Sequence, residues 1–246
     1  MPPRPRPALV LPLTGPPLAR LRPRPLRARL VARPSRFTCQ VRLRGAQVIA
    51  HLPDPGRLTG NLAPGCPVLL DGPHPGRLCP YTLLAVRAGS TWVATVPVYA
   101  NRVFPRLLAG GLFPELPAGP LTAEVTHGRS RFDFHAGAAV VEVKSVTLAR
   151  GAAALFPDAV TARGARHCGE LARLARRGTP AAIVFLAQRA DVVSVAPADD
   201  IDPAFGRALR RAARAGVLVL AAALALAPAG AARAWRIPVA LGPAAR

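Results

Sequence analysis

Lysine is nearly absent from this chain, in which Lys144 stands alone among 32 arginines. A compositional drift explains arginine in place of lysine, but that swap leaves the charge unchanged and does not explain a formal net charge of +21. Acidic residues are scarce too: the first is Asp54, and the charge is +12 over residues 1–88 and +9 over residues 89–246. Clustered arginine favours a polyanion partner, because its binding releases counterions from phosphates. An anionic membrane surface and a merely solvated basic surface are the alternatives.

Cysteine and long apolar runs are scarce as well. The four cysteines form no C-x-x-C pair and have no histidine at zinc-ligand spacing, which predicts reduced thiols and a cytoplasmic protein. Prolines and arginines interrupt every apolar run near the N-terminus, so no signal-peptide pattern is expected. The longest apolar run, residues 217–227, is too short to span a bilayer. The cysteines are Cys39, Cys66, Cys79 and Cys168.

Aromatic residues make up only 5% of the chain. Phe37, Tyr81 and Trp92 are too few for a base-stacking platform in the N-terminal half, and core packing is the expected use of these rings. The hydrophobic fraction of 51% predicts a buried interior and excludes disorder throughout the chain.

Three regions follow from the pattern of turns and apolar runs. Residues 1–18 are rich in Pro and Arg and are expected to be a disordered leader. Residues 19–88 contain short strand-like runs separated by Gly and Pro, which predicts a small β-barrel. Residues 89–246 alternate strand and helix patterns, which predicts an α/β domain. The overall fold class is therefore α/β.

The second region contains a clear series of predicted elements. An antiparallel hairpin is expected over residues 130–148, and a helix after Pro157–Asp158 that runs to about Arg177. The continuous apolar run 181–187 is typical of a strand buried on both faces. Asp202 and Pro203 are N-cap and first-turn residues of a helix that runs to Arg214, and a strand at 217–222 follows.

The hairpin carries the residues with the clearest chemistry. Residues two apart in a strand share a face. If the hairpin register puts Phe132 and Phe134 on the same side as the valines that flank Glu142, the opposite face of the hairpin is polar. That face then gathers Asp133, Glu142 and Lys144. Carboxylate oxygens suit Mg²⁺ or Mn²⁺, and an ammonium beside the ion can orient a water or stabilise charge at phosphorus. A solvated E-x-K strand face is the alternative, and Glu124 is a weaker third acidic ligand.

These residues also match known families. The pattern D-x8-E-x-K on a hairpin, followed by a helix, resembles the core of the PD-(D/E)XK nuclease superfamily. Five blocks resemble, in order, those of the sugar fermentation stimulation protein family, from about residue 25 onward. The blocks are "HLPDPGRLTG", "VYANR", "GRSRFDF", "VEVKSVTL" and "FPDAVTARGARHCGEL".

The resemblance implies an OB-like N-terminal barrel, a nuclease-like α/β domain with a central mixed sheet, and sequence-tolerant binding to DNA. By motif position, Asp133, Glu142 and Lys144 correspond to the catalytic acid, acid and lysine. Glu124 corresponds to the preceding acidic position, so Glu124, Asp133 and Glu142 are the expected metal ligands. The family usually has Asn where this chain has Asp54, which puts a base or phosphate contact there in doubt. The Pro/Arg-rich leader, residues 1–18, is an addition to the family pattern.

Further basic residues are candidates for nucleic-acid contacts. On a helix that starts near Pro157, Asp158 shares a face with Arg163, Arg166 and His167. This face is a candidate for phosphate binding, and a merely solvated helix face is the alternative. Arg131 is placed to hold a scissile phosphate or to neutralise Asp133 in an ion pair. Arg57 and His51 lie near a loop that needs no ligand to form its turn. The candidates are Arg57, Arg129, Arg131, Arg163, Arg166 and His167.

Together these features predict a sugar fermentation stimulation protein homologue that binds DNA, with RNA as the alternative, and does not bind membranes. A Mg²⁺- or Mn²⁺-dependent phosphodiesterase site is one hypothesis. A non-catalytic DNA-binding regulator of sugar (maltose-type) metabolism is the other. The oligomeric state stays open, with a homodimer among the alternatives.

Overall fold

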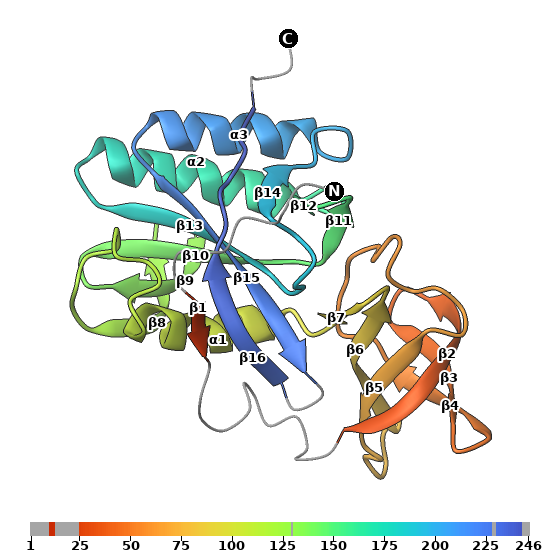
Figure 1. Ribbon diagram of the computed structural model, residues 1–246. Coiled ribbons are helices and arrows are strands. Elements are labelled where there is room, and N and C mark those ends of the chain that lie inside the picture. Colours follow the sequence, from red (N-terminus) through yellow and green to blue (C-terminus); the bar gives the residue numbers. More distant parts are fainter. Residues whose placement is uncertain (1–9, 13–24, 129, 228–229, 243–246) are drawn as a thin grey trace.

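The protein is a β-barrel joined to an α/β domain, as the computed structural model shows (Figure 1). The structure describes residues 10–12, 25–128, 130–227 and 230–242, so Arg129 lies outside the described residues. Within these ranges no helix is long and apolar enough to cross a membrane.

The barrel is built from short strands with inward apolar residues. Its sheet order is β4-β3-β2-β5-β6-β7, and a parallel pairing of β4 with β6 closes five strands into a barrel, which gives the OB-like connectivity. In β3 the buried residues alternate, so Cys39, Val41 and Leu43 point into the core and Arg42 points out. β7 pairs with β6, so this sheet runs to Ala94. The strands are β2 (Leu26–Ser35), β3 (Thr38–Leu43), β4 (Ala46–His51), β5 (Pro67–Asp71), β6 (Tyr81–Ala88) and β7 (Thr91–Ala94).

The α/β domain is organised around a mixed sheet of seven strands in the order β1-β16-β15-β13-β10-β9-β8. The three central strands β10, β13 and β15 are parallel, and the outer pairings are antiparallel. Val10–Pro12, inside the predicted leader, form the edge strand β1 against β16. The other strands are β8 (Leu121–His127), β9 (Ser130–Ala136), β10 (Ala139–Val146), β13 (Ala181–Ala187), β15 (Leu218–Ala227) and β16 (Gly230–Arg236).

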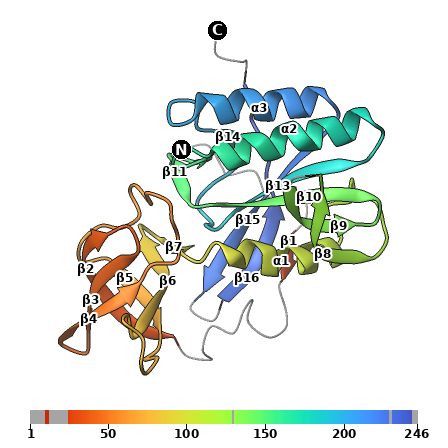
Figure 2. The same ribbon diagram turned by 180° about the vertical axis from the view of Figure 1, so that it is seen from behind.

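Helices cover both faces of this sheet. α1 (Val98–Ala109) lies below it in Figure 1, while α2 (Ala162–Arg176) and α3 (Pro203–Arg214) lie above it, and Figure 2 shows the same layers from behind. One apolar cluster fills the space between the sheet and α1, and a second fills the space under α2 and α3. All seven residues of β13 are buried, which confirms the strand predicted from its continuous apolar run.

The helices α2 and α3 differ in how well their beginnings were predicted. α3 begins as predicted, because Asp202 accepts a hydrogen bond from the Phe205 amide and Pro203 occupies the first turn. α2 begins at Ala162, and Thr161 caps it by accepting from the Gly164 amide at 3.1 Å. The helix expected after Pro157–Asp158 is therefore present but begins later than Asp158, because a loop follows β12 (Ala153–Phe156) as far as Thr161.

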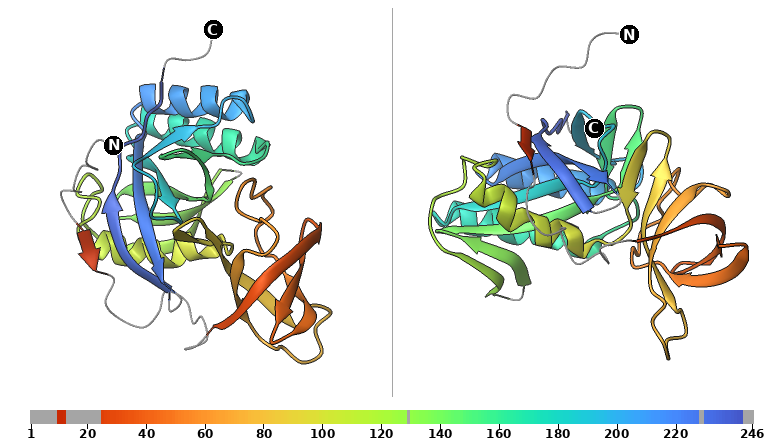
Figure 3. Two further views of the ribbon diagram at one scale, coloured as in Figure 1. Left: turned by 45° about the vertical axis from the view of Figure 1, so that its right-hand side comes forward. Right: turned by 60° about the horizontal axis from the view of Figure 1, so that its bottom comes forward.

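The α/β domain has a small second sheet, and a polar interface connects the two domains. β12 lies between β11 (Leu148–Arg150) and β14 (Ser194–Pro197). Arg189 is 7% exposed and donates to the Asn61 side chain at 3.0 Å and to the Thr147 carbonyl at 2.8 Å. Asn61 also donates to that carbonyl, so a buried arginine and amide tie the barrel to the end of β10. Figure 3 shows the barrel beside one end of the large sheet.

Candidate active site

β10 places Glu142 and Lys144 at the centre of the α/β domain. Val141 and Val143 belong to the apolar cluster on the α1 side. Because side chains alternate, Glu142 and Lys144 face the α2 side, where Glu142 is only 5% exposed. The hairpin predicted from sequence is confirmed, since β9 and β10 pair antiparallel with Val141 opposite Phe134.

One oxygen of Glu142 is held by two basic side chains. Oε1 accepts a hydrogen bond from Lys144 Nζ at 2.6 Å and from His167 Nδ1 at 2.7 Å. The other oxygen, Oε2, is buried and has no hydrogen-bond partner among the described residues. A buried, unpaired carboxylate oxygen is costly, so its persistence points to a cation or donor that the protein chain does not supply.

Asp133 reaches the site from a split between two strands. β9 pairs with β10 only from Ala136 back to Phe134, and beyond that point the Asp133 carboxylate takes the place of a strand partner. Asp133 Oδ2 accepts from the Val143 amide at 2.8 Å, and Oδ1 accepts from Asn101 Nδ2 on α1 at 2.6 Å. Both oxygens are therefore fixed in direction.

The expected alignment of the phenylalanines was only half right. Phe134 packs with Val141 and Val143 on the α1 side, but Phe132 lies in the cluster on the opposite side of the sheet. The reason is the split, because β9 leaves β10 after Phe134 and carries Phe132 toward His167, with ring centroids 5.2 Å apart.

The two carboxylates have opposite electrostatic surroundings. Burial, and next the charge of Glu142, raise the pKa of Asp133, and the bonds from the Val143 amide and Asn101 only partly offset this. Burial also acts to raise the pKa of Glu142, but the hydrogen bonds and charges of His167 and Lys144 outweigh it and hold that pKa below its usual value. Paired carboxylates whose pKa values are pushed apart are typical of acid–base and metal sites.

His167 positions Glu142 rather than lying free on a helix surface. It is 2% exposed on α2, donates through Nδ1 to Glu142, and accepts at Nε2 from Arg163 Nε at 3.4 Å. Because a carboxylate can only accept, Nδ1 carries a proton. The predicted i, i+4 relation of Arg163 and His167 is thus present, whereas Asp158 lies before the helix.

Glu124 and Arg131 lie away from this network. Arg131 donates to Glu124 at 2.8 Å, and both side chains are mostly exposed, at 62% and 67%. Glu124 lies on the edge strand β8, so the structure does not bring it to the carboxylates of Asp133 and Glu142. Over the described ranges, no group of three or more His, Cys, Asp or Glu side chains is arranged to hold a metal ion.

The other predicted basic residues fall in two places. Arg57 is exposed in the barrel loop, where its carbonyl accepts from Arg33. Arg166 lines a groove of about 600 Å³ between α2 and the β8–β9 turn. Arg173 and Arg177 line the same groove, which makes it a basic surface next to His167. Sequence reasoning had not singled out these two arginines.

Asn101 and Gln188 are further polar residues that the sequence analysis gave no role. Asn101 lies within the block "VYANR", so the block was a signal for it, but nothing in the sequence placed it against Asp133. Gln188 follows β13, donates to Ser145 Oγ at 2.7 Å, and has its own Oε1 buried without a partner among the described residues. Ser145 is thereby fixed beside Lys144.

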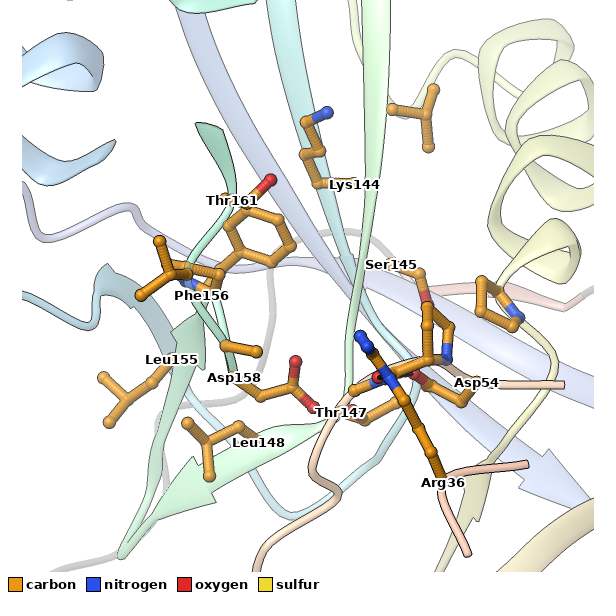
Figure 4. A pocket seen from close by; sticks show the side chains of 17 residues that line it. Arg36, Asp54, Lys144, Ser145, Thr147, Leu148, Leu155, Phe156, Asp158 and Thr161 are labelled. Carbon is orange, nitrogen blue, oxygen red and sulfur yellow. Dashed lines mark hydrogen bonds between the residues drawn. The ribbon is translucent and has the colours of Figure 1, made fainter. Parts of the chain in front are cut away.

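A cavity of about 320 Å³ opens next to Lys144, between the barrel and the α/β domain (Figure 4). The barrel contributes Arg36 and the loop Asp54–Gly56, and the other wall includes Lys144 and Asp158. Asp158 Oδ2 accepts from the Leu58 amide at 3.2 Å, so this carboxylate joins the two domains.

The cysteines take no part in the site. All four are free thiols, and Cys39 and Cys168 are buried. Burial raises the pKa of Cys39 to about 11 and that of Cys168 to about 12, so both are inert as nucleophiles near neutral pH.

The fold defines a class of two-domain protein, in which an OB-like barrel precedes an α/β domain with a mixed sheet. Family models match both parts: the SfsA N-terminal OB domain over residues 31–95, and the sugar fermentation stimulation protein RE domain over residues 98–230. The chain belongs to the sugar fermentation stimulation protein family.

Individual relatives are similar to this protein over most of the chain. A sugar fermentation stimulation protein homolog of Symbiobacterium thermophilum is 42% identical over 92% of this chain and 97% of its own. One of Moorella thermoacetica is 42% identical over 80% of this chain and 88% of its own. The structure of Pyrococcus furiosus SfsA in complex with Ca²⁺ is similar with a TM-score of 0.78 and 28% identity, covering 87% of this chain and 95% of that one.

Proposed function

We propose that this protein binds DNA with little sequence preference and hydrolyses phosphodiester bonds at the Asp133–Glu142–Lys144 site with Mg²⁺ or Mn²⁺. The observation that carries the proposal is the buried Glu142 Oε2, which has no partner in the described chain while Oε1 is held by Lys144 and His167. We further place the protein in the cytoplasm, in keeping with its free thiols.

The donor set fits a small hard cation. Asp133 and the free oxygen of Glu142 are the two residues that would hold it, and Mg²⁺ commonly takes one or two carboxylates and completes its shell with water and substrate phosphate. The Ca²⁺ named for the Pyrococcus furiosus relative, also an oxygen-loving cation, supports this assignment. Such an ion, when bound, supplies positive charge for polarising a phosphoryl oxygen.

The chain's own residues divide the remaining tasks. Asn101 and the Val143 amide orient Asp133, and His167 orients Glu142, so both carboxylates are held before substrate arrives. Lys144 is a compact cation in contact with Glu142, placed to transfer its hydrogen bond to a phosphate oxygen as negative charge develops. Arg166 and the other arginines of the groove, together with Arg163 one turn earlier on α2, would bind the nucleic-acid backbone.

The test is a cleavage assay on single- and double-stranded DNA and RNA with Mg²⁺ or Mn²⁺. Asp133→Ala and Lys144→Ala are the matched variants, and both are expected to abolish cleavage while DNA binding persists. No cleavage by the wild type, or cleavage unaffected by both substitutions, would overturn the catalytic part of the proposal.

A second function is a non-catalytic DNA-binding regulator of sugar metabolism, of the maltose type. The observation that favours it is the lack of a three-residue metal cluster in the described part of the chain, where Lys144 itself neutralises Glu142. A regulator would bind DNA equally in EDTA and in Mg²⁺ and would not cleave it. Sedimentation of the DNA complex would also decide whether the homodimer expected as one alternative forms.

A further inference from the structure

The interdomain cavity has a fixed hydrogen-bond acceptor that no protein group uses. Asp158 lines the cavity, and its Oδ2 accepts from the Leu58 amide. Oδ1 has no hydrogen-bond partner in the described part of the chain. Gly56 lets this carboxylate approach, because a Cβ at position 56 would lie 2.1 Å from Asp158 Oδ2. The backbone of the barrel loop therefore holds the carboxylate in place with one oxygen left free.

A flat cation faces this carboxylate. Arg36 Nε donates to the Pro55 carbonyl at 2.6 Å, which fixes the guanidinium on the barrel loop. In Figure 4 the Arg36 guanidinium and the Asp158 carboxylate point toward one another across the cavity. Arg36 also lies 5.6 Å from the centre of the Phe37 ring, and Phe37 is 46% exposed beside it. An arginine plane and an exposed ring are surfaces on which a base can stack.

Apolar side chains form much of the rest of the lining, which also includes Ser145, Thr147 and Thr161 and ends at the candidate active site. Leu148, Leu155 and Phe156 contribute side chains to the wall, and Lys144 closes one end. A mostly apolar cleft with a few fixed polar groups is typical of a site for a flat organic ligand. Asp54 and Asp158 disfavour a phosphate in the part of the cavity that they line, which leaves the Lys144 end for it. An intact duplex does not fit, because its bases are enclosed between two backbones.

We propose that this cavity receives one unstacked nucleobase of a single strand, whose phosphate lies at Lys144. This inference rests on the proposed nucleic-acid function and names its substrate class: single-stranded or locally opened nucleic acid. Enzymes that act on a strand commonly place one base in a pocket and read it by hydrogen bonds.

The free oxygen gives the pocket a preference. Asp158 Oδ1 accepts the exocyclic amino group of cytosine, adenine or guanine. Thymine offers only an N3–H between two carbonyl oxygens, whose lone pairs face the carboxylate. The cavity therefore favours amino-bearing bases over thymine.

The experiment measures binding of labelled oligonucleotides by fluorescence anisotropy in EDTA, where metal-dependent cleavage is prevented. The probes are a thymine tract, the same tract with one central cytosine, and a duplex of the second. We expect the single cytosine to tighten single-strand binding about tenfold, since a hydrogen bond to a charged acceptor is among the stronger ones. The duplex should lose this advantage.

The matched variant is Asp158→Asn, which keeps an oxygen for the Leu58 amide and replaces the free acceptor by an NH₂ donor. It should abolish the cytosine advantage and leave affinity for the thymine tract within about twofold. Asp200→Asn, an exposed carboxylate outside the cavity, should change neither.

The outcomes separate this inference from the function on which it rests. Equal binding of all three probes, or a cytosine advantage that survives in Asp158→Asn, would overturn the base pocket while DNA binding stands. Absence of binding to every probe would instead remove the nucleic-acid function. Displacement of the oligonucleotide by free dCMP at equal concentration would overturn the single-strand assignment in favour of a free nucleotide.

Discussion

Two pairs of acidic side chains, both at least partly buried, lie on either side of Lys144, and their partners differ. In the first pair, Glu142 is held by the cationic Lys144 and by His167. In the second, Asp54 accepts from the Gly56 amide and Asp158 from the Leu58 amide. The first pair accepts hydrogen bonds from side chains of β10, α1 and α2 and from the Val143 amide, whereas the second accepts hydrogen bonds from backbone amides of the barrel loop.

This difference sets the charge that each pair keeps. The hydrogen bonds and charges of His167 and Lys144 outweigh burial and hold the pKa of Glu142 low, so Glu142 stays ionised and can attract a cation. Burial raises the pKa of Asp54 to about 6, with the charge of Asp158 adding to the rise. Amides alone leave the second pair less neutralised, which suits a joint between domains better than a metal site.

The largest expected effect is at Lys144, the single lysine. Lys144→Arg keeps the charge but replaces a compact ammonium by a planar fork, so cleavage should fall by on the order of a hundredfold while DNA affinity stays within about twofold. The cleavage rate and a binding isotherm in Ca²⁺ measure the two. Arg150→Gln, on the exposed surface, is the control. Wild-type cleavage by the arginine variant would mean that the lysine has no special role.

The second effect concerns Asp54, where the family usually has Asn. The pKa of Asp54 in the folded protein is about 6, above the ordinary value of 3.8. The contribution of this carboxyl group to the free energy of unfolding is therefore fully present below about pH 4, where the group is protonated, and is lost as the pH rises through 6. Asp54→Asn carries no such loss. The variant should gain up to about 3 kcal/mol relative to wild type between pH 4 and pH 8. Urea unfolding across this range measures the gain.

Asp200→Asn is the control for that gain, because Asp200 is exposed and its pKa is lowered by the hydrogen bond from Arg150. It should show no gain at high pH. If the difference in the free energy of unfolding between Asp54→Asn and the wild type does not change with pH, the pKa of Asp54 is not raised by folding.

A smaller effect is expected at His167. His167→Phe keeps a ring against Phe132 but removes the bond to Glu142, so the free energy of unfolding at pH 7 should fall by about 2 kcal/mol. Denaturant titration measures it, with His51→Phe in the exposed part of the barrel as the control. An unchanged stability would show that Lys144 alone suffices to hold Glu142.

The smallest effect is expected in the basic groove. Replacing Arg166 and Arg173 by Gln should reduce the slope of log K against log salt by about 2, since each phosphate contact contributes about 0.9. Titrations of DNA at several salt concentrations give the slope. The control is the double variant Arg150→Gln and Arg207→Gln, which removes the same charge from residues outside this groove. An equal reduction of the salt slope in this control would mean that only the net charge of the protein matters.

Much of the local structure was predictable because neighbouring residues determine it. The apolar run 181–187 could be satisfied only by a strand with both faces covered, and Asp202 with Pro203 fixed the start of α3. The hairpin, and the spacing that puts Glu142 and Lys144 on one face, follow from alternation within a strand. The start of α2 was missed because Thr161, four residues after Pro157, supplies the cap.

The sequence by itself determined which residues are candidates for chemistry: the arginines that are in excess, the single lysine and the paired acids of the hairpin. Only the tertiary structure decided their partners, because those contacts join residues far apart in the chain. Asn101 reaches Asp133 from α1, His167 reaches Glu142 from α2, and Asp158 meets Leu58 across 100 positions. Alternation specifies the face on which a side chain lies, but only packing of whole elements sets what it meets there.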